Sequence, residues 1–244
     1  MLRLLILLLL LPLFQDAGAR IASAVPKVDF GRIKEEDGPV KRRFYIYNVD
    51  TVPQALLKIA PSCGCTAVDF QKESFAPGDS VWVDIIYDPE LRPGKFEKYV
   101  RVYPVEGPMI RVPIEGVVEA TASTVDYHYP VDAGLLHLTE KTLFSSRPLL
   151  ERQRSFFVDV YNTAEIPVWM EIENANEAIE TEIYPNPVPP KESATISFFV
   201  DPDNEKRRDV SQYTVNLYNS DTPEEIKKST PVEIKIITDN HGTP

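Results

Sequence analysis

The strongest constraint on the fold is an internal repeat, because the apolar pattern of residues 44–114 recurs in residues 158–236. In each copy, an apolar segment that ends in Asn leads through an apolar residue and a proline into a second apolar segment, and Asn48 and Asn162 are 114 residues apart. The other matched segments are Val81–Tyr87 and Ala194–Val200, Val100–Val102 and Val215–Leu217, and Ile110–Ile114 and Val232–Ile236. A repeat of this length predicts two copies of one domain.

The matched segments alternate apolar and polar residues, which is typical of strands that bury one face. Fully buried parallel strands would instead be continuously apolar. Short alternating strands separated by turn residues predict an all-β chain with two tandem immunoglobulin-like antiparallel β-sandwich domains. In the segment 80–87 we expect inward side chains at Val81, Val83, Ile85 and Tyr87, and outward side chains at Ser80, Trp82, Asp84 and Ile86.

The predicted domains occupy residues 26–119 and 125–239. Residues 120–125 are small and polar without an apolar period, so we interpret them as a linker. A short helical turn is expected between Asp126 and Arg152. Asp88-Pro89 and Asp201-Pro202 occupy matching positions after a strand, where Asp before Pro favours a turn.

The N-terminus has the three-part pattern of a secretory signal peptide, which we assign to residues 1–24. Arg3 supplies a positive charge, Leu4–Phe14 is continuously apolar, and Ala17–Ala19 and Ala22–Ala24 are two possible cleavage motifs. The apolar run is too short to cross a bilayer, so we expect a mature chain that does not span the membrane and begins near Arg20 or Val25. The predicted location is the periplasm or the extracellular space.

The charge and the motifs exclude several classes of function. The net charge of −11 disfavours nucleic-acid binding, because an acidic surface repels phosphate groups. The sequence contains no nucleophile elbow, zinc-protease helix, P-loop or dinucleotide fingerprint. We therefore predict a protein that is not an enzyme, has no catalytic residue and uses no cofactor.

The first domain carries several motifs in a fixed order. They are Phe30-Gly31, Phe44–Asn48, Ser62-Cys63-Gly64-Cys65-Thr66, Phe75–Asp79, Tyr87–Pro89 and Pro93–Phe96. In these motifs, residues 28 to 118 resemble the bacterial relatives of the ASPM–SPD–Hydin immunoglobulin-like modules, a domain-of-unknown-function family with a Ser-Cys-Gly-Cys-Thr signature. The resemblance implies a sandwich of about seven or eight strands, similar to the major sperm protein and pilus-chaperone folds. It implies no enzymatic activity and no agreed molecular function.

Cys63 and Cys65 are the two cysteines of the chain, and three alternatives are open for them. The first is a disulfide, which requires a bend at Gly64, because two extended residues span about 6.6–7.2 Å and bridged Cα atoms lie about 4.4–6.8 Å apart. Such a small ring would be a candidate redox element. The second is a structural pair of small apolar side chains at a strand end. The third is a weak metal site for a soft ion such as Cu(I) or Zn(II).

Aromatic residues at outward positions are candidate interface residues. Trp82 can anchor a protein interface, or it can be covered by a loop or the neighbouring domain. Four tyrosines are candidates for one aromatic surface that binds a peptide or glycan, with cross-strand packing as the alternative. They are Tyr45, Tyr47, Tyr99 and Tyr103.

Two main functions follow from these observations. The leading hypothesis is an exported binding or scaffolding protein whose partner is another envelope or extracellular protein, bound through sheet edges or loops. The alternative is a redox or metal-handling protein that uses Cys63 and Cys65. A glycan-binding adhesin is a third hypothesis. The sequence specifies neither the partner nor the oligomeric state.

Overall fold

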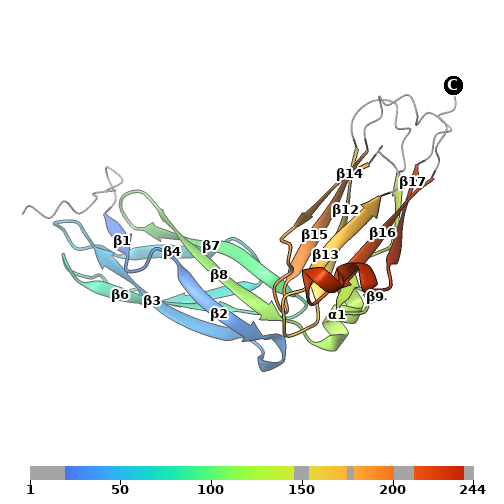
Figure 1. The fold of residues 1–244 in the computed structure, drawn as a ribbon. Helices are drawn as coiled ribbons and strands as arrows, with labels where there is room; N and C mark the ends of the chain where they lie inside the picture. Colours follow the sequence, from blue (N-terminus) through green and yellow to red (C-terminus); the bar gives the residue numbers. More distant parts are fainter. Residues whose placement is uncertain (1–19, 146–153, 175–178, 201–211, 239–244) are drawn as a thin grey trace, which may run out of the picture. The chain divides into compact units, whose positions relative to one another are not determined.

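A computed structural model describes residues 20–145, 154–174, 179–200 and 212–238, and Figure 1 shows that their regular secondary structure consists mainly of β-strands. Residues 1–19 of the predicted signal peptide lie outside the described residues, and Asp201-Pro202 also lies outside them. Among the described segments, no helix has the length and apolar character needed to span a membrane.

The first sandwich contains two four-stranded sheets, in the orders β1-β3-β6-β5 and β2-β8-β7-β4. Its strands are β1 (Ile21–Ser23), β2 (Val28–Lys34), β3 (Val40–Asn48), β4 (Leu56–Pro61), β5 (Thr66–Phe70), β6 (Ser80–Tyr87), β7 (Gly94–Pro104) and β8 (Ile110–Glu119), with a 3-10 turn at Glu35–Asp37. This strand number agrees with the prediction of about seven or eight strands.

The second sandwich contains a five-stranded sheet, β14-β15-β12-β10-β9, and a four-stranded sheet, β11-β17-β16-β13. Its strands are β9 (Val131–Ala133), β10 (Leu136–Leu138), β11 (Thr142–Ser145), β12 (Arg154–Asn162), β13 (Trp169–Asn174), β14 (Ile179–Tyr184), β15 (Ser193–Val200), β16 (Gln212–Ser220) and β17 (Val232–Thr238), with a 3-10 helix at Pro223–Lys228. The edge strand β11 pairs parallel to β17, with Leu143 opposite Ile236. This parallel pair departs from the wholly antiparallel sheets that the sequence predicts.

The two sandwiches are built on the same core positions. On β6 the side chains predicted to point inward, Val81, Val83, Ile85 and Tyr87, are all at most 1% exposed. Their counterparts on β15, Ala194, Ile196 and Phe198, pack in the second core against residues of both its sheets. The period-two pattern therefore predicts the buried face correctly in both copies.

The repeated Asn is buried, and its side chain forms hydrogen bonds to the backbone of the turn that follows its strand; we call this arrangement the Asn clamp. Asn162 is fully buried, and its Nδ2 donates to the carbonyl oxygens of Ile166 (2.8 Å), Val188 (3.0 Å) and Pro189 (3.1 Å). Its Oδ1 accepts a hydrogen bond from the amide nitrogen of Ala164 at 2.8 Å.

Asn48 makes the matching set in the first sandwich. Its Nδ2 donates to Val52 O (2.9 Å) and Phe75 O (3.1 Å), while its Oδ1 accepts from Asp50 N (2.9 Å). Because each amide satisfies buried backbone groups from two separate loops, the repeated Asn is explained by the fold.

The segment interpreted as a linker contains a helix. Helix α1 spans Ala122–His128, and the side chain of Thr121 accepts a hydrogen bond from the Thr124 amide at its N-terminus. The expected helical turn thus begins earlier than Asp126. Because the helix is short, the buried side chains are few and an apolar period is not visible in the sequence.

Candidate functional site

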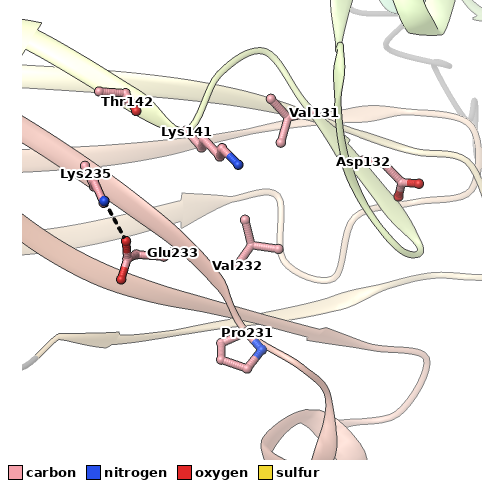
Figure 2. Close-up of a pocket in the computed structure, with 8 residues that line it drawn as sticks. All are labelled: Val131, Asp132, Lys141, Thr142, Pro231, Val232, Glu233 and Lys235. Carbon is pink, nitrogen blue, oxygen red and sulfur yellow. Dashed lines mark ion pairs between the residues drawn. The ribbon is translucent and has the colours of Figure 1, made fainter.

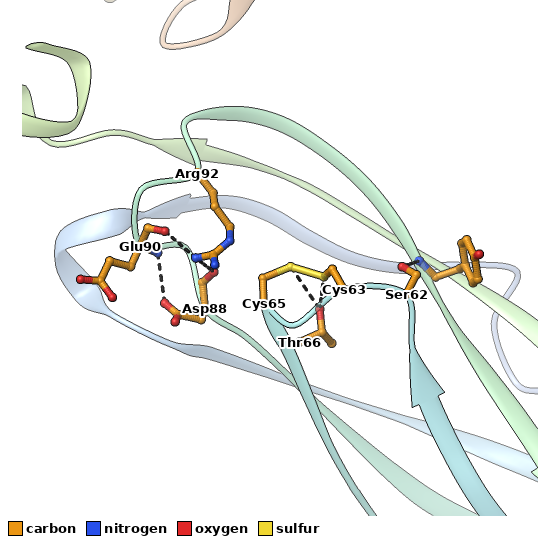
Figure 3. The surroundings of a disulfide bond; sticks show 8 residues. Ser62, Cys63, Cys65, Thr66, Asp88, Glu90 and Arg92 are labelled. Carbon is orange, nitrogen blue, oxygen red and sulfur yellow. Dashed lines mark hydrogen bonds between the residues drawn. A yellow bond between two sulfur atoms is a disulfide. The ribbon is translucent and has the colours of Figure 1, made fainter. Parts of the chain in front are cut away.

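Cys63 and Cys65 form a disulfide in the connection between β4 and β5, with their Cα atoms 5.3 Å apart (Figure 3). Cys65 is buried, Cys63 is half-buried, and the Thr66 hydroxyl lies 3.3 Å from the Cys63 sulfur. A Cβ added at Gly64 would meet nothing within 4 Å, and Gly64 has no left-handed φ. The Cα separation confirms the bend that a disulfide requires at residue 64, and the backbone there does not depend on glycine.

The chemistry of this pair depends on its oxidation state. A metal ion is bound by thiolates, so the bridged sulfurs would have to be reduced before they could serve as ligands. The redox role of the pair stays a prediction. Counting free thiols in the native protein with and without a dithiol reductant tests it.

The disulfide turn is joined to β7 through Ser62. The Ser62 amide donates to Tyr99 O at 2.9 Å, and Ser62 Oγ accepts from the Tyr99 amide at 3.1 Å. These two bonds extend the pairing of β4 with β7 up to the first cysteine. The first residue of the turn is thereby fixed to the backbone of Tyr99.

Tyr99 lies within a cluster of cations on the outer face of its sheet. The Arg111 guanidinium lies 3.6 Å from the centre of the Tyr99 ring, and the Arg101 guanidinium lies 4.8 Å from it. Arg101 Nη2 also donates to Tyr99 Oη at 2.7 Å. Tyr103 lies on the same face of β7, two residues beyond Arg101, and Lys58 Nζ lies 4.7 Å from the centre of its ring. Cation–π stacking holds these side chains in defined positions.

The other sheet carries the second aromatic group on its outer face. Tyr45 and Tyr47 of β3 are 45% and 44% exposed. Trp82, on the neighbouring strand β6, is half-buried, and the Arg43 guanidinium lies 4.7 Å from its ring centre. An arginine of the adjacent strand thus covers part of Trp82, whereas the sequence predicts cover by a loop or by the neighbouring domain.

The four tyrosines do not form one surface. Tyr45 and Tyr47 extend from the sheet β1-β3-β6-β5, whereas Tyr99 and Tyr103 extend from the sheet β2-β8-β7-β4. Since the residues between them on each strand are buried in the same core, the two pairs lie on the two outer faces of the sandwich. Of the two alternatives for these tyrosines, the single aromatic surface is therefore excluded.

Asp84 was predicted to point outward from β6, but its side chain is only 2% exposed. Arg43 covers it with Nε–Oδ1 and Nη2–Oδ2 contacts of 2.6 and 2.8 Å, and Lys41 Nζ lies 2.6 Å from Oδ2. The hydrogen bonds from Arg43 lead the causes that hold the pKa of Asp84 well below its usual range, against the opposing effect of burial. The carboxylate is on the expected face, but two long cationic side chains shield it from water.

The sheet edges beside the disulfide turn are poorly suited to pairing with another strand. On β4, Ser62 directs its amide toward β7, so Pro61 faces the open side and offers no N–H there. On β5, the Phe70 amide donates a hydrogen bond to Asp69 Oδ1 at 2.9 Å, so it is already paired within its own strand. The proline and the local hydrogen bond both reduce the number of backbone groups that are available for strand addition. The outer faces are consequently better candidates for binding than these two edges.

A groove of about 360 Å³ lies in the second sandwich beside β11 and β17 (Figure 2). Its charged lining includes Asp132 and Lys141, and Lys235 forms an ion pair with Glu233 at 3.0 Å. The groove combines charges of both signs on an exposed surface. Among the described residues that line it, no arrangement of side chains specifies a ligand.

The arginines that contact the candidate aromatic residues were not identified from the sequence alone. Arg43 supports Trp82 and Asp84, while Arg101 and Arg111 surround Tyr99. A signal was present in the alternation Tyr99-Val100-Arg101-Val102-Tyr103, which places aromatic and cationic side chains on one sheet face. Arg111 could not be found in this way, because its strand neighbour is known only from the sheet order.

Comparison with solved structures gives remote likenesses. A protein of unknown function from Porphyromonas gingivalis W83 is 13% identical, with 91% of this chain and 100% of that chain covered and a TM-score of 0.37. The YadV chaperone is 11% identical (89% and 98% covered, TM-score 0.34), and the Pseudomonas aeruginosa CupB2 chaperone is 13% identical (89% and 100% covered, TM-score 0.32). No curated protein matches the chain.

The comparison with protein families concerns the first sandwich. Its match begins at the buried strand β1, includes the disulfide turn and ends within β8. Residues 21–118 match the family described as "Protein of unknown function (DUF1573)".

Proposed function

We propose that this protein is exported and acts without enzymatic activity, as a binding or scaffolding protein whose partner is another envelope or extracellular protein. The observation that carries the proposal is the outer face of β3 and β6, where Tyr45 and Tyr47 are each close to half exposed beside Trp82 and Arg43. Tyrosine, tryptophan and arginine are the residues that most often dominate protein interfaces. A rigid sheet presents them at little cost in conformational entropy.

The proposed family relation concerns the fold of the first sandwich. We infer that the first sandwich is related to the bacterial ASPM–SPD–Hydin modules through Ser62–Thr66, the segment that holds the disulfide turn. Such modules have no agreed function, so the relation contributes the fold and leaves the partner open.

The aromatic face predicts the result of a binding comparison. Wild-type protein immobilised through its C-terminus, exposed to detergent-solubilised envelope extract and crosslinked, should retain a defined partner. The double variant Tyr45→Ser/Tyr47→Ser should retain it at least about tenfold less, because truncating interface aromatics costs more than about 1 kcal/mol each. Quantitative mass spectrometry of the retained proteins measures the difference.

A matched control distinguishes binding through this face from nonspecific binding through any exposed tyrosine. Tyr127 of helix α1 is 73% exposed, and Tyr127→Ser removes a more exposed ring. The Tyr127→Ser variant should retain the partner as the wild type does. Equal retention by all variants, or none by the wild type, would contradict the proposal.

Export leads to a separate prediction about signal-peptide cleavage. Ile21 is fully buried, β1 pairs with β3, and Arg20 forms an ion pair with Glu106 at 2.8 Å. Cleavage after Ala24 would remove this strand, whereas cleavage after Ala19 keeps it. Intact mass and N-terminal sequencing of protein from the envelope fraction should therefore give a mature N-terminus at Arg20. A mature chain that begins at Val25, or an uncleaved cytoplasmic chain, would argue against this account.

A further inference from the structure

Three cations, Arg101, Arg111 and Lys58, lie together at one part of the outer face of the sheet β2-β8-β7-β4, on a protein with a net charge of −11. Arg101 and Arg111 both lie within 5 Å of the Tyr99 ring centre, and Lys58 stacks on Tyr103. Elsewhere on the first sandwich, cations such as Arg20 and Arg43 are paired with carboxylates. Among the residues that the structure describes, Arg101, Arg111 and Lys58 have no carboxylate partner.

Two guanidinium groups that share one ring repel each other unless an anion lies close to both. Stacking on Tyr99 fixes the plane of Arg111, and the hydrogen bond to Tyr99 Oη fixes Arg101. Tyr99 Oη accepts that bond, so its own proton is available to donate to an incoming acceptor. The cluster thus combines oriented guanidinium donors with one hydroxyl donor, a set suited to a carboxylate.

The surroundings of the cluster leave one side open. Ala60 of β4 lies opposite Arg101 in the strand pairing, and Lys58 lies opposite Tyr103. Because the alanine side chain is short, no long side chain stands between Arg101 and the edge of the sheet at this strand position. An acidic side chain approaching across β4 can therefore reach Arg101 and Lys58 along the same path.

We propose that the cluster of Arg101, Arg111 and Tyr99 binds the carboxylates of an acidic segment of a partner protein. This inference rests on the proposed binding function and names a chemical class for its partner. The overall negative charge disfavours a long polyanion, which would meet repulsion outside the cluster. A short acidic segment satisfies the cluster without that repulsion, and the rings of Tyr99 and Tyr103 provide apolar contact beside it.

The test is an NMR titration of the mature wild-type protein with the peptide Ac-Glu-Ala-Glu-NH2, monitored at the Arg side-chain Nε–H signals. Saturable shifts should appear at Arg101 and Arg111, and the peptide Ac-Gln-Ala-Gln-NH2 should produce none. Arg111→Gln and Arg101→Gln should each weaken binding by about tenfold or more, because each removes charge-assisted hydrogen bonds. Added salt should weaken wild-type binding as well.

Lys98→Gln serves as the control, because Lys98 is an exposed cation next to Tyr99 on the same strand. It removes one positive charge and leaves the cluster intact, so it should change the affinity less than twofold. Shifts that are equal for the two peptides, or that survive the arginine substitutions, would overturn the proposal. Saturable shifts with inorganic phosphate or with phosphatidylglycerol vesicles, and none with the glutamate peptide, would also overturn it.

This result is independent of the test of Tyr45 and Tyr47, which lie on the opposite outer face. A partner lost on substitution of those tyrosines, together with no glutamate binding, would leave the proposed function standing and reject only the carboxylate site. The absence of any partner in the first test would reject the proposed function itself.

Discussion

Replacing Asn162 with alanine is expected to lower the free energy of unfolding of the second sandwich by about 3 kcal/mol, the largest effect that we predict for a single substitution. The side chain is fully buried and makes four hydrogen bonds to backbone groups. Alanine leaves three carbonyl oxygens and one amide without this partner, and it creates a small cavity. Thermal unfolding followed by calorimetry should show a fall of about 10 °C or more in one transition.

Asn48, the equivalent residue of the first sandwich, provides a second test of this prediction. Asn48→Ala removes the matching clamp, so it should lower the transition of the first sandwich by a comparable amount. Asn216→Ala, at a half-buried position of β16, is the control and should change either transition by less than about 0.5 kcal/mol. If Asn162→Ala behaves like Asn216→Ala, the clamp does not stabilise the fold.

Asp84→Asn is expected to destabilise the first sandwich by about 2 kcal/mol at neutral pH. The substitution keeps the size of the side chain but leaves Arg43 and Lys41 without a covered counter-charge. The cations are themselves about half exposed, so solvent screening keeps the effect below that of a fully buried pair. Asp69→Asn, at the position opposite Asp84 on β5, removes an exposed carboxylate and should have a much smaller effect. Chemical denaturation of the three proteins measures the difference.

The pH dependence of the Asp84 contribution has a defined sign. Because the folded-state pKa of Asp84 lies well below its usual range, its stabilising effect is complete above the unfolded-state pKa of about 3.9. As the pH falls from there toward the folded-state pKa, the unfolded chain takes up the proton first and the effect is lost. The stability difference between wild type and Asp84→Asn should be constant from about pH 5 to 7 and shrink below about pH 4. A difference that grows on acidification would contradict the ion-pair assignment.

The sequence predicts the sandwiches well because burial on one sheet face leaves a period of two. Val83 and Ile196 are fully buried at matching positions, and Asn48 and Asn162 mark the same turn in both copies. The same alternation predicts the direction of a side chain but cannot predict what covers it. Asp84 points to the expected face and is nevertheless shielded, because Arg43 and Lys41 fold over it from the neighbouring strand.

The candidate sites depend on contacts between strands that are distant in sequence. Tyr45 and Tyr99 are similar in sequence character, but they extend from different sheets, and only the strand order separates them. Arg111 meets Tyr99 through the packing of β8 beside β7, which no local pattern encodes. The disulfide was one of three alternatives because a Cys-x-Cys spacing permits it without requiring it.

The central claim, that the outer face of β3 and β6 binds another protein, is tested most directly by photocrosslinking in the intact envelope. The chain carries p-benzoylphenylalanine in place of Tyr45, and a second chain carries it in place of the more exposed Tyr127. We predict a discrete light-dependent adduct with one partner protein from position 45 and none from position 127. Light-dependent adducts of equal yield from both positions, or the lack of any adduct from position 45, would contradict the claim.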